Sequence, residues 1–422
     1  MTDNVYDIAG IGIGPFNLGL AALADPLKEL KCIFFDRKQS FSWHEGMMID
    51  SVKLQVPFYA DLVTGAEPSN PYSFLNYMKQ TGRLFQFAIL EDNYITRKEY
   101  NDYCCWVAAH LNNLLFGRTV VEITYDNLLE TYQVKTKTTN GQYEFFRAKH
   151  IVLGIGPVPF VPDIINGCCD ASLFHSSQYL QYREALHLTK NVIIVGSGQS
   201  AAEIFCDVLQ QPGRIVEKIE WVTKAERLFP MDTSKFSLEM ASPDYIDYFH
   251  SLPEKERAKK LKGQDMLYKG INQELLAYIY RLLYHNNEKE VLIRTGCELE
   301  NLVKENGNYR LEFYNAEQNK HYETTADAVV LATGYHRPQP KFLDGLKKRI
   351  LWEGDKYLVN RNYSIDENKK EIFVQNADLH SHGFNAPDLG MGTYRNAVIL
   401  NTILGEDYFM IEKNIAFQAF GI

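Results

Sequence analysis

Two short apolar runs in this chain are each followed by a glycine-rich turn and then by a helical pattern. The first run covers residues 5–9, ahead of a helix that starts near Leu18. The second covers residues 191–195, ahead of a helix over residues 201–209. A continuous apolar run bounded by turn residues is typical of a strand that is buried on both faces. The sequence therefore predicts two strand–turn–helix units, each within a parallel sheet.

The remaining patterns predict how the chain is arranged around these units. Strands are expected at residues 32–35, 151–153, 219–223 and 326–331, and residues 234–287 show helical spacing. This order predicts an α/β fold with two nested Rossmann-like domains and a smaller helical insert that walls the substrate site. We assign residues 1–165 and 326–422 to the first domain, 170–233 and 288–325 to the second, and 234–287 to the insert. The strand from Ala326 is expected to return to the first sheet, where Asp327 and the turn at Thr333 can reach a cofactor.

The first glycine turn has the residue types that a dinucleotide requires. Small residues let backbone N–H groups approach a pyrophosphate at the positive end of the following helix. The next strand ends in an acid, which in this motif binds an adenosine ribose hydroxyl. The residues expected to bind the cofactor here are Gly10, Gly12, Gly14, Pro15, Asn17 and Asp36.

The second glycine turn differs from the first in the residues at the end of its next strand. That strand ends in Lys224, with Arg227 close by, where the first unit has an acid. Cations at this point are how the fold accepts a ribose 2′-phosphate, so we predict NADPH rather than NADH. The alternative is that both cations are ordinary solvated charges. Two dinucleotides in one chain indicate a flavin reduced by a nicotinamide, the latter bound in part by Gly196, Gly198, Gln199 and Ser200.

Composition narrows the function classes. The net charge of −9 gives no general basic field, so nucleic acid and anionic membrane surfaces are not expected partners. The seven cysteines include no CxxC pair, which argues against a disulfide reductase and indicates reduced thiols in a cytoplasmic protein. The polar N-terminus and the absence of a membrane-length apolar stretch predict neither a signal peptide nor a membrane span. We also find no metal-ligating pattern and expect no metal.

Ordered motifs spread over nearly the whole chain are more specific than either glycine turn. They are FSWHEGMM at residues 41–48, LQV at 54–56, DLVT at 61–64, NPYSFLNY at 70–77, FHSS at 174–177, LATGY ending at Tyr335, and His382-Gly383. Together they resemble the siderophore N-hydroxylating monooxygenases, a family that includes lysine N6-, ornithine N5- and diamine hydroxylases. The resemblance implies FAD, NADPH, O₂ and hydroxylation of a primary amine. In that family O₂ adds at the flavin C4a position and an unprotonated amine attacks the distal oxygen of the hydroperoxide.

The resemblance also implies roles for single residues. Gln55 matches a catalytic glutamine near the flavin and nicotinamide, and Asn272 matches an asparagine that contacts substrate. Ser242 stands where the amino-acid hydroxylases use Asn or Thr at the substrate site. Asn272 could instead cap a helix, and Trp43 could be a core residue. The cofactor-binding residues that complete the set are Trp43, His44, Thr333, Tyr335 and Leu389.

One departure from the family pattern concerns the substrate. In the ornithine and lysine hydroxylases the segment after the glutamine resembles Gln-x-x-Phe-x-Lys-Asp-Leu, and that lysine pairs with the substrate α-carboxylate. Here the lysine position is Ala60. A buried carboxylate without a cation costs on the order of several kcal/mol. We therefore expect a substrate that lacks the carboxylate, namely an aliphatic diamine such as putrescine or cadaverine.

The second ammonium of a diamine needs an acidic partner. The candidate is Asp388, with Glu239 and Asp244 of the insert as alternatives, although Asp388 could instead brace its own loop. Putrescine is preferred because the segments around Ala60 and Asp388 resemble those of the putrescine hydroxylases, while cadaverine stays possible.

Other functions stay open at this point. An amino-acid hydroxylase could use Lys53 or Lys269 for the carboxylate. A Baeyer–Villiger or sulfur-oxidising flavoprotein shares the oxygen chemistry, and a non-catalytic redox sensor would bind the same cofactors. The resemblance also suggests a homo-oligomer, either a tetramer or a dimer.

Overall fold

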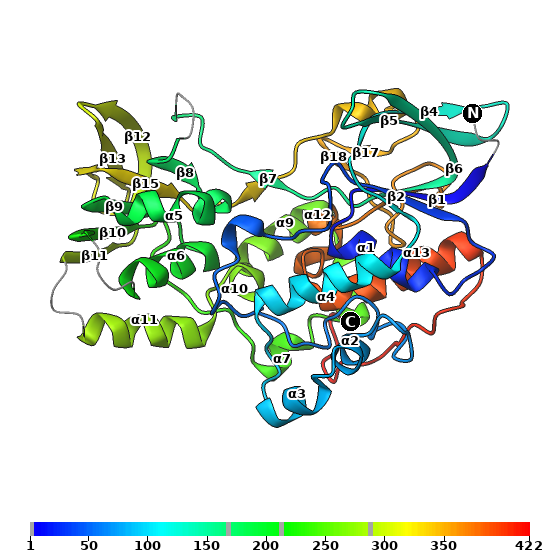
Figure 1. The fold of residues 1–422 in the computed structure, drawn as a ribbon, viewed down its shortest axis with the longest axis horizontal. Helices are drawn as coiled ribbons and strands as arrows, with labels where there is room; N and C mark the ends of the chain where they lie inside the picture. Colours follow the sequence, from blue (N-terminus) through cyan, green and yellow to red (C-terminus); the bar gives the residue numbers. More distant parts are fainter. Residues whose placement is uncertain (1–3, 166–169, 211–214, 286–289) are drawn as a thin grey trace.

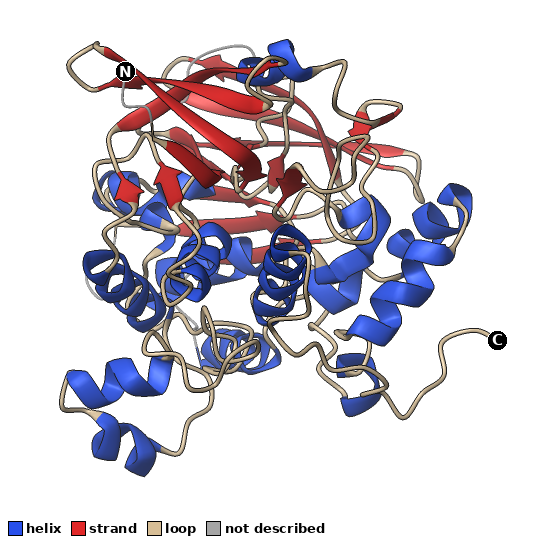
Figure 2. Ribbon diagram, turned by 90° about the vertical axis from the view of Figure 1, so that its right-hand side faces the viewer, coloured by secondary structure: helices blue, strands red, loops and turns tan. Residues whose placement is uncertain are grey.

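The computed structural model describes residues 4–165, 170–210, 215–285 and 290–422 and confirms the mixed α/β fold (Figure 1). Two large sheets lie apart along the long axis of the molecule. Seen from the side, most helices lie on one side of the strands (Figure 2). Cys168 and Cys169, counted among the reduced cysteines, lie outside the described residues. No helix in the described ranges is long and apolar enough to cross a membrane.

The first sheet is built around the first predicted strand. β1 (Val5–Ile11) lies parallel to both β2 and β6, so both its faces are buried, as its apolar run requires. Helices α1, α4 and α13 pack on the side of Ile8, while Ala9 and Ile11 face the opposite core. The strand order is β3-β2-β1-β6-β5-β4, and β19 also pairs with β6. The strand bounds are β2 Cys32–Phe35, β3 Leu114–Leu115, β4 Arg118–Asp126, β5 Thr131–Thr138, β6 Tyr143–Leu153 and β19 Ile372–Val374. The helix bounds are α1 Pro15–Ala24, α4 Arg97–His110 and α13 Gly390–Leu404.

The second sheet is parallel throughout its described strands. Its order is β11-β10-β9-β15-β8, and β9 (Asn191–Val195) is the second predicted strand. One face packs against α6 and α11, and the other packs against a small antiparallel sheet. The further bounds are β8 Leu173–His175, β10 Lys218–Val222, β11 Glu290–Arg294, β15 Ala328–Leu331, α5 Tyr179–His187, α6 Gln199–Gln210 and α11 Gln273–His285, with β12 Glu298–Glu305, β13 Asn308–Asn315 and β14 Lys320–Ala326 in the small sheet.

The strand that begins after Ala326 lies in the second sheet, so its predicted return to the first sheet is wrong. β15 pairs with β9 and β8. The Asp327 carboxylate accepts hydrogen bonds from the amides of Lys190 and Asn191 and does not point to the first sheet. Only Asp327 separates β14 from β15, which leaves no chain length for a crossing. The apolar pattern identified the strand correctly but carries no information about its neighbours.

The two crossings between the sheets lie against each other. The outgoing chain forms β7 (Val158–Pro159) and the returning chain forms β16 (Tyr335–His336), and the two pair antiparallel. β7 lies between the two large sheets in Figure 1. We therefore propose residues 1–165 and about 336–422 as the first domain, which moves the predicted boundary by about ten residues.

The helical pattern over residues 234–287 forms helices, but they do not make a single unit. α8 and α9 contact α12 and η4 of the last part of the chain, whereas α11 packs on α6 of the second sheet. The insert helices before α11 are α7 Lys235–Leu238, α8 Pro243–Ser251, α9 Glu254–Gly263 and α10 Asp265–Tyr268, and their neighbours are α12 Leu379–His382 and η4 Gly383–Asn385. Two further helices, α2 (Phe74–Gln80) and α3 (Leu84–Leu90), contact each other, and α2 also contacts α4.

The C-terminal tail crosses the insert. The Asp244 carboxylate accepts hydrogen bonds from three successive tail amides, those of residues 414 to 416. The ring of Phe420 packs edge-on against Tyr245, with 5.1 Å between ring centroids. The tail therefore belongs to the packing of the insert.

We predict that Asp244→Asn loosens the tail. An amide side chain has one acceptor oxygen where the carboxylate has two. Because these hydrogen bonds to the tail are partly exposed, we expect their loss to destabilise the docked tail by about 1–2 kcal/mol in total. Chymotrypsin cleavage between residues 414 and 422 should accelerate about five- to thirtyfold. Asp247→Asn on the same helix is the matched control, because that carboxylate bonds the Arg361 side chain and not the tail. Equal cleavage rates for both variants would contradict the prediction.

Candidate functional site

The first glycine turn leaves room for a phosphate only at one point. A Cβ on Gly10 would lie inside the ring of Phe34, and one on Gly12 would lie 2.6 Å from the carbonyl oxygen of Gly154. Gly12 also has φ +88°, which favours glycine. A Cβ on Gly14, by contrast, would meet nothing within 4 Å. α1 begins at the next residue, Pro15, which has no N–H, and no side chain caps the helix. The N–H groups of the first turn are therefore left for a ligand, which fits the pyrophosphate of FAD.

Two predicted cofactor residues of this turn also hold the turn in shape. Asn17 is fully buried and its Nδ2 donates to the carbonyl oxygen of Gly12 at 2.8 Å. The Asp36 carboxylate accepts the amide of Ile13 at 2.7 Å and that of Lys38 at 2.8 Å. Asp36 thus stands at the end of β2, next to the turn, as the ribose prediction requires. Asn17 acts through the backbone, which residue type alone does not reveal.

The second glycine turn repeats the geometry of the first. A Cβ on Gly196 would lie 2.2 Å from the carbonyl oxygen of Ala332, whereas one on Gly198 would be nearly free, with its nearest neighbour at 3.9 Å. α6 begins at Gln199, so Ser200 lies in its first turn. The residues that are present therefore fit a second dinucleotide.

The two cations expected to hold a 2′-phosphate are exposed beyond the end of β10. Lys224 pairs with Glu298 at 3.5 Å and Arg227 with Glu226 at 3.8 Å. Both side chains are mostly exposed, so these surface pairs hold them weakly and they can turn to a ligand. Their role toward NADPH stays a prediction.

Gln55 and Asn272 lie on either side of Gln199 at the junction of the two sheets. Gln55 Nε2 donates to the carbonyl oxygen of Gly270 at 3.0 Å and to Gln199 Oε1 at 3.4 Å. The backbone amide of Asn272 donates to the same Gln199 oxygen at 2.8 Å. Asn272 Oδ1 accepts the amide of Leu275 at 3.1 Å, so the expected alternative of a helix cap is present. A contact between Asn272 and substrate stays a prediction.

Aromatic rings line the place where the chain crosses between the sheets. Trp43 and His44 contact each other with 4.4 Å between ring centroids, and Tyr335 lies 6.5 Å from His44 and 5.2 Å from His175. Thr333 bonds the carbonyl oxygen of Phe160 through its hydroxyl. Trp43, His44, Thr333 and Tyr335 therefore come together from two separate segments, and their role toward a cofactor stays a prediction.

His175 shows how the crossing is held. Its Nδ1 accepts the amide of Ser177, so Nε2 carries the proton and donates to the carbonyl oxygen of Gly334 at 2.9 Å. Burial lowers the pKa of His175, which keeps the imidazole neutral. The FHSS motif thus supports the turn of the LATGY motif.

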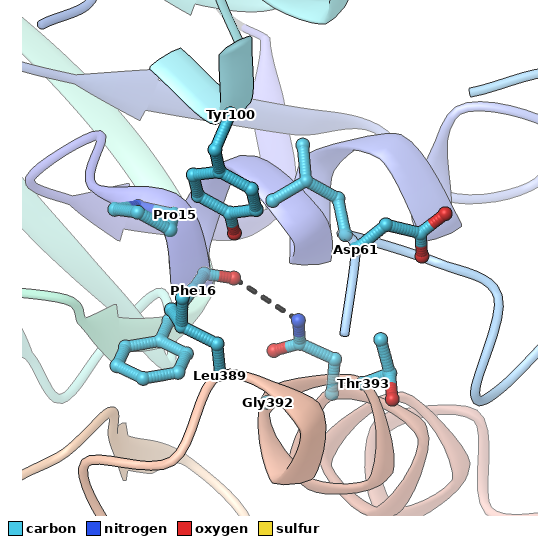
Figure 3. Close-up of a pocket in the computed structure, with 9 residues that line it drawn as sticks. Pro15, Phe16, Asp61, Tyr100, Leu389, Gly392 and Thr393 are labelled. Carbon is cyan, nitrogen blue, oxygen red and sulfur yellow. Dashed lines mark hydrogen bonds between the residues drawn. The ribbon is translucent and has the colours of Figure 1, made fainter. Parts of the chain in front are cut away.

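A small cavity separates the start of α1 from the start of α13 (Figure 3). Leu389 and Gly392 line it from the α13 side, and Asn396 Nδ2 donates across to the carbonyl oxygen of Phe16 at 3.0 Å. Asn396 and Phe16 were not expected here from the sequence, since a buried asparagine and a half-buried phenylalanine in helices are of ordinary type. They fix α13, with Leu389 before it, against the first glycine turn.

Ala60 and Asp388 both lie close to Gly390. A Cβ on Gly390 would be 3.6 Å from the Cβ of Ala60 and 3.1 Å from Oδ1 of Asp388. Asp388 Oδ1 also accepts the amide of Met391 at 3.0 Å, so Asp388 does brace the start of α13. Burial raises the pKa of Asp388. It also raises the pKa of the neighbouring Tyr59, with the charge of Asp388 as a second cause.

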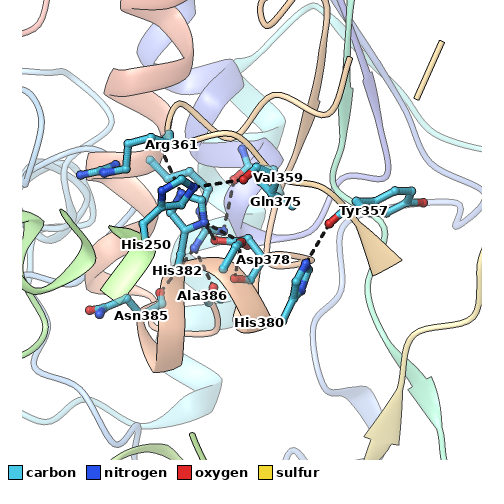
Figure 4. Close-up of polar contacts among 12 residues, drawn as sticks. His250, Tyr357, Val359, Arg361, Gln375, Asp378, His380, His382, Asn385 and Ala386 are labelled. Atoms are coloured by element: carbon cyan, nitrogen blue, oxygen red, sulfur yellow. Dashed lines mark hydrogen bonds and ion pairs between the residues drawn. The ribbon is translucent and has the colours of Figure 1, made fainter. Parts of the chain in front are cut away.

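His382 supports the segment that carries Asp388 (Figure 4). Its Nε2 donates to the carbonyl oxygen of Arg361 at 3.2 Å, its Nδ1 contacts the Ser381 hydroxyl, and its ring stacks on Tyr363. Complete burial holds the pKa of His382 well below its usual range, so the ring is neutral. The His-Gly motif is therefore a structural support for this segment.

Three of the predicted substrate residues have other partners. Ser242 is fully buried and its hydroxyl caps α8 by accepting the amide of Tyr245. Asp244 binds the tail amides, and Glu239 binds the amide and side chain of Gln418. The Ser-Pro pair at residues 242–243 is itself a helix-start signal, so this role of Ser242 could be read from the sequence. The structure thus corrects the assignment of Ser242, and it engages both alternative acids elsewhere.

Comparison with known proteins bears on what this arrangement does. Residues 4–337 match the family model described as L-lysine 6-monooxygenase/L-ornithine 5-monooxygenase. The chain is 43% identical to a putrescine N-hydroxylase of Shewanella oneidensis over 99% of this chain and 84% of the relative. It is 42% identical to a putrescine N-hydroxylase of Acinetobacter baumannii over 99% of this chain and 94% of the relative. The crystal structure of a cadaverine monooxygenase of desferrioxamine biosynthesis from Erwinia amylovora, bound to FAD, superposes with a TM-score of 0.97 at 44% identity, covering 100% of this chain and 99% of that one.

We predict that Gly14→Ala leaves the fold intact but weakens FAD binding at least about tenfold, or about 1.4 kcal/mol. The new methyl group would stand in open space within the unliganded protein and in the approach of the pyrophosphate. The flavin-to-protein absorbance ratio after gel filtration measures the loss. Gly263→Ala is the control, because its Cβ also meets nothing but lies at the end of α9. Full flavin retention in Gly14→Ala would place the pyrophosphate elsewhere.

We also predict that Lys224→Ala combined with Arg227→Ala reduces the preference for NADPH over NADH. Two fewer cations at the 2′-phosphate should raise the KM for NADPH about tenfold or more and leave that for NADH nearly unchanged. Steady-state kinetics with both nucleotides tests this, with Lys235→Ala, on α7, as a surface-charge control. An unchanged preference would show that the two cations are only solvated charges.

Proposed function

Because the chain belongs to the L-lysine 6-monooxygenase/L-ornithine 5-monooxygenase family of flavin-dependent N-hydroxylating enzymes, we propose that it hydroxylates one primary amine of an aliphatic diamine. We propose FAD and NADPH as its cofactors, since the similar cadaverine monooxygenase is bound to FAD and the second glycine turn fits a further dinucleotide. We propose putrescine as the favoured substrate, cadaverine as a second one, and the biosynthesis of a hydroxamate siderophore as the setting. The observation that carries the proposal is the position of Asp388 beside Ala60.

The chemistry divides between cofactor and protein. FAD reduced by NADPH supplies activated oxygen when both are bound. The residues of this chain then have to bind the cofactors at the two glycine turns, exclude water, and present a neutral amine. Gln55 and Asn272 at the junction are the polar groups proposed to act near the reacting amine.

The acid near residue 60, Asp388, supports a diamine as the substrate. The family resemblance puts a lysine at this position in enzymes that bind a substrate carboxylate. In this chain the position carries no charge, and the carboxylate of Asp388 lies close to the same glycine, Gly390. An acid stabilises an ammonium and repels a carboxylate, so the local charge suits the second amine of a diamine.

The rival cations and acids all have partners. Lys53 pairs with Asp92 at 2.5 Å and Lys269 with Asp265 at 2.8 Å, so a substrate carboxylate at either lysine would lie close to an acid that repels it. Asp244 and Glu239 bind the C-terminal tail. Asp388 is thus the acid that the proposal uses. Charge does not distinguish putrescine from cadaverine, because the two carry the same ammonium groups. They differ by one methylene, which is worth only about 1–3 kcal/mol in a pocket. The two similar putrescine hydroxylases support putrescine.

We expect hydroxylamine product from putrescine and cadaverine, and little from L-ornithine or L-lysine, when FAD-loaded enzyme is given NADPH under air. The product is measured together with NADPH consumed. Product from an amino acid alone would overturn the diamine proposal but keep the reaction class. NADPH consumption that no amine accelerates would favour a Baeyer–Villiger or sulfur-oxidising enzyme, or a redox sensor.

The same assay tests Asp388. Asp388→Asn should raise the diamine KM about tenfold or more, because the distal ammonium loses its counter-charge. Adding Ala60→Lys should move the preference toward L-ornithine or L-lysine. Asp344→Asn, an exposed acid in the segment 341–346, is the control. An unaltered diamine KM in Asp388→Asn would leave this residue only its role at the start of α13.

A further inference from the structure

We infer that Glu203, on α6, is a positioning residue that fixes the orientation of the Gln55 amide through Gln199. α6 packs on the second sheet, whereas Gln55 lies in the part of the chain that we assign to the first domain. The inference rests on the family reaction and on the hydrogen bonds at the junction. It does not depend on which amine is the substrate.

The Glu203 carboxylate is held by a buried ion pair. Its side chain is 0% exposed and Arg97, at the start of α4, is 12% exposed. The two form a bidentate pair, with Nη2 to Oε1 at 2.8 Å and Nη1 to Oε2 at 3.0 Å. Arg97 Nη1 also donates to the carbonyl oxygen of Met47. Because both partners are fixed, the carboxylate has one position and remains ionised beside the guanidinium.

This carboxylate determines which way the next amide points. An ionised carboxylate only accepts hydrogen bonds, so the group that Gln199 turns to Glu203 must be its NH₂; the distance from Nε2 to Oε1 is 3.0 Å. Gln199 Oε1 then faces the opposite way. There it accepts the amide of Asn272 at 2.8 Å and Nε2 of Gln55 at 3.4 Å.

The same reasoning sets Gln55. Gln199 offers it an acceptor, and the carbonyl oxygen of Gly270 offers a second acceptor at 3.0 Å. Both contacts require the NH₂ end of Gln55, so the carbonyl oxygen Oε1 is the end directed away from them. A Gln55 amide turned by 180° would place two oxygens against each other at both contacts. Glu203 therefore acts together with the Asn272 amide and the Gly270 carbonyl oxygen, and the three groups make Gln55 present an acceptor to the junction.

A double-mutant cycle distinguishes this role from a merely structural one. Glu203→Gln keeps the shape but gives Gln199 a neighbour that can donate or accept, so of the groups that set the two amides only the Asn272 amide and the Gly270 carbonyl oxygen still oppose a turned orientation. We expect hydroxylamine formed per NADPH to fall about tenfold in Glu203→Gln, and by less than twofold when Glu203→Gln is added to Gln55→Ala. NADP⁺ titration of the flavin absorbance is the second readout, and it should show the same non-additivity without turnover. This readout remains informative even if no diamine is hydroxylated.

Two further variants complete the test. Glu220→Gln is the matched control: Glu220 is also buried and pairs with an arginine, Arg294 at 2.6 Å, in the same sheet, but it has no contact with Gln199 or Gln55 among its described hydrogen bonds. Its effect should be the same in both backgrounds. Gln199→Leu breaks the chain of amides but keeps the ion pair, and it should reproduce Glu203→Gln even if that variant folds poorly. Equal effects of Glu203→Gln with and without Gln55, or an inert Gln199→Leu, would overturn the inference.

Discussion

The arrangement of this protein depends on two places where one backbone passes another with no room for a side chain. Gly12 lies against the carbonyl group of Gly154, and Gly196 lies against that of Ala332. Each contact closes the turn at the carboxyl end of a central parallel strand, which is where open α/β sheets bind ligands. Because β7 and β16 join the two sheets at the same ends, both turns serve one junction. The aromatic residues, the two glutamines Gln55 and Gln199, and the segment before α13 complete the junction with their side chains.

Local features of this fold were predictable from sequence, and long-range ones were not. The strands before both glycine turns, and those at residues 32–35 and 219–223, come from apolar runs that any parallel neighbours would bury. The same run at residues 328–331 was assigned to the wrong sheet, because an apolar strand does not encode its partners. Asp244 and Glu239 suggested substrate contacts by charge alone, since nothing near them in sequence shows that residues 414–418 fold back on them. The junction residues Gln55, Gln199 and Asn272 could be named from motifs. The ion pair of Arg97 and Glu203 could not, because it joins α4 to α6 and the two residues are far apart in the sequence.

The substrate end of the site shows how one fold accommodates opposite charges. Ala60 and Asp388 both lie close to Gly390, at the start of α13. In the proposed function a cation at residue 60 would suit a carboxylate, and its absence near an acid suits an ammonium. The glycine turns, by contrast, are shaped by backbone contacts that do not involve either side chain, so the same cofactor-binding fold can serve substrates of different charge.

The tail that crosses the insert has a consequence for how the protein is made. Phe420 packs in an aromatic cluster with Tyr245 of the insert and Phe384 of η4. Synthesis proceeds from the N-terminus, so this cluster can form only after residue 420 has been made, when both sheets already have all their described strands. The aromatic packing of the insert is therefore completed late in folding, after the two sheets against which the other helices pack.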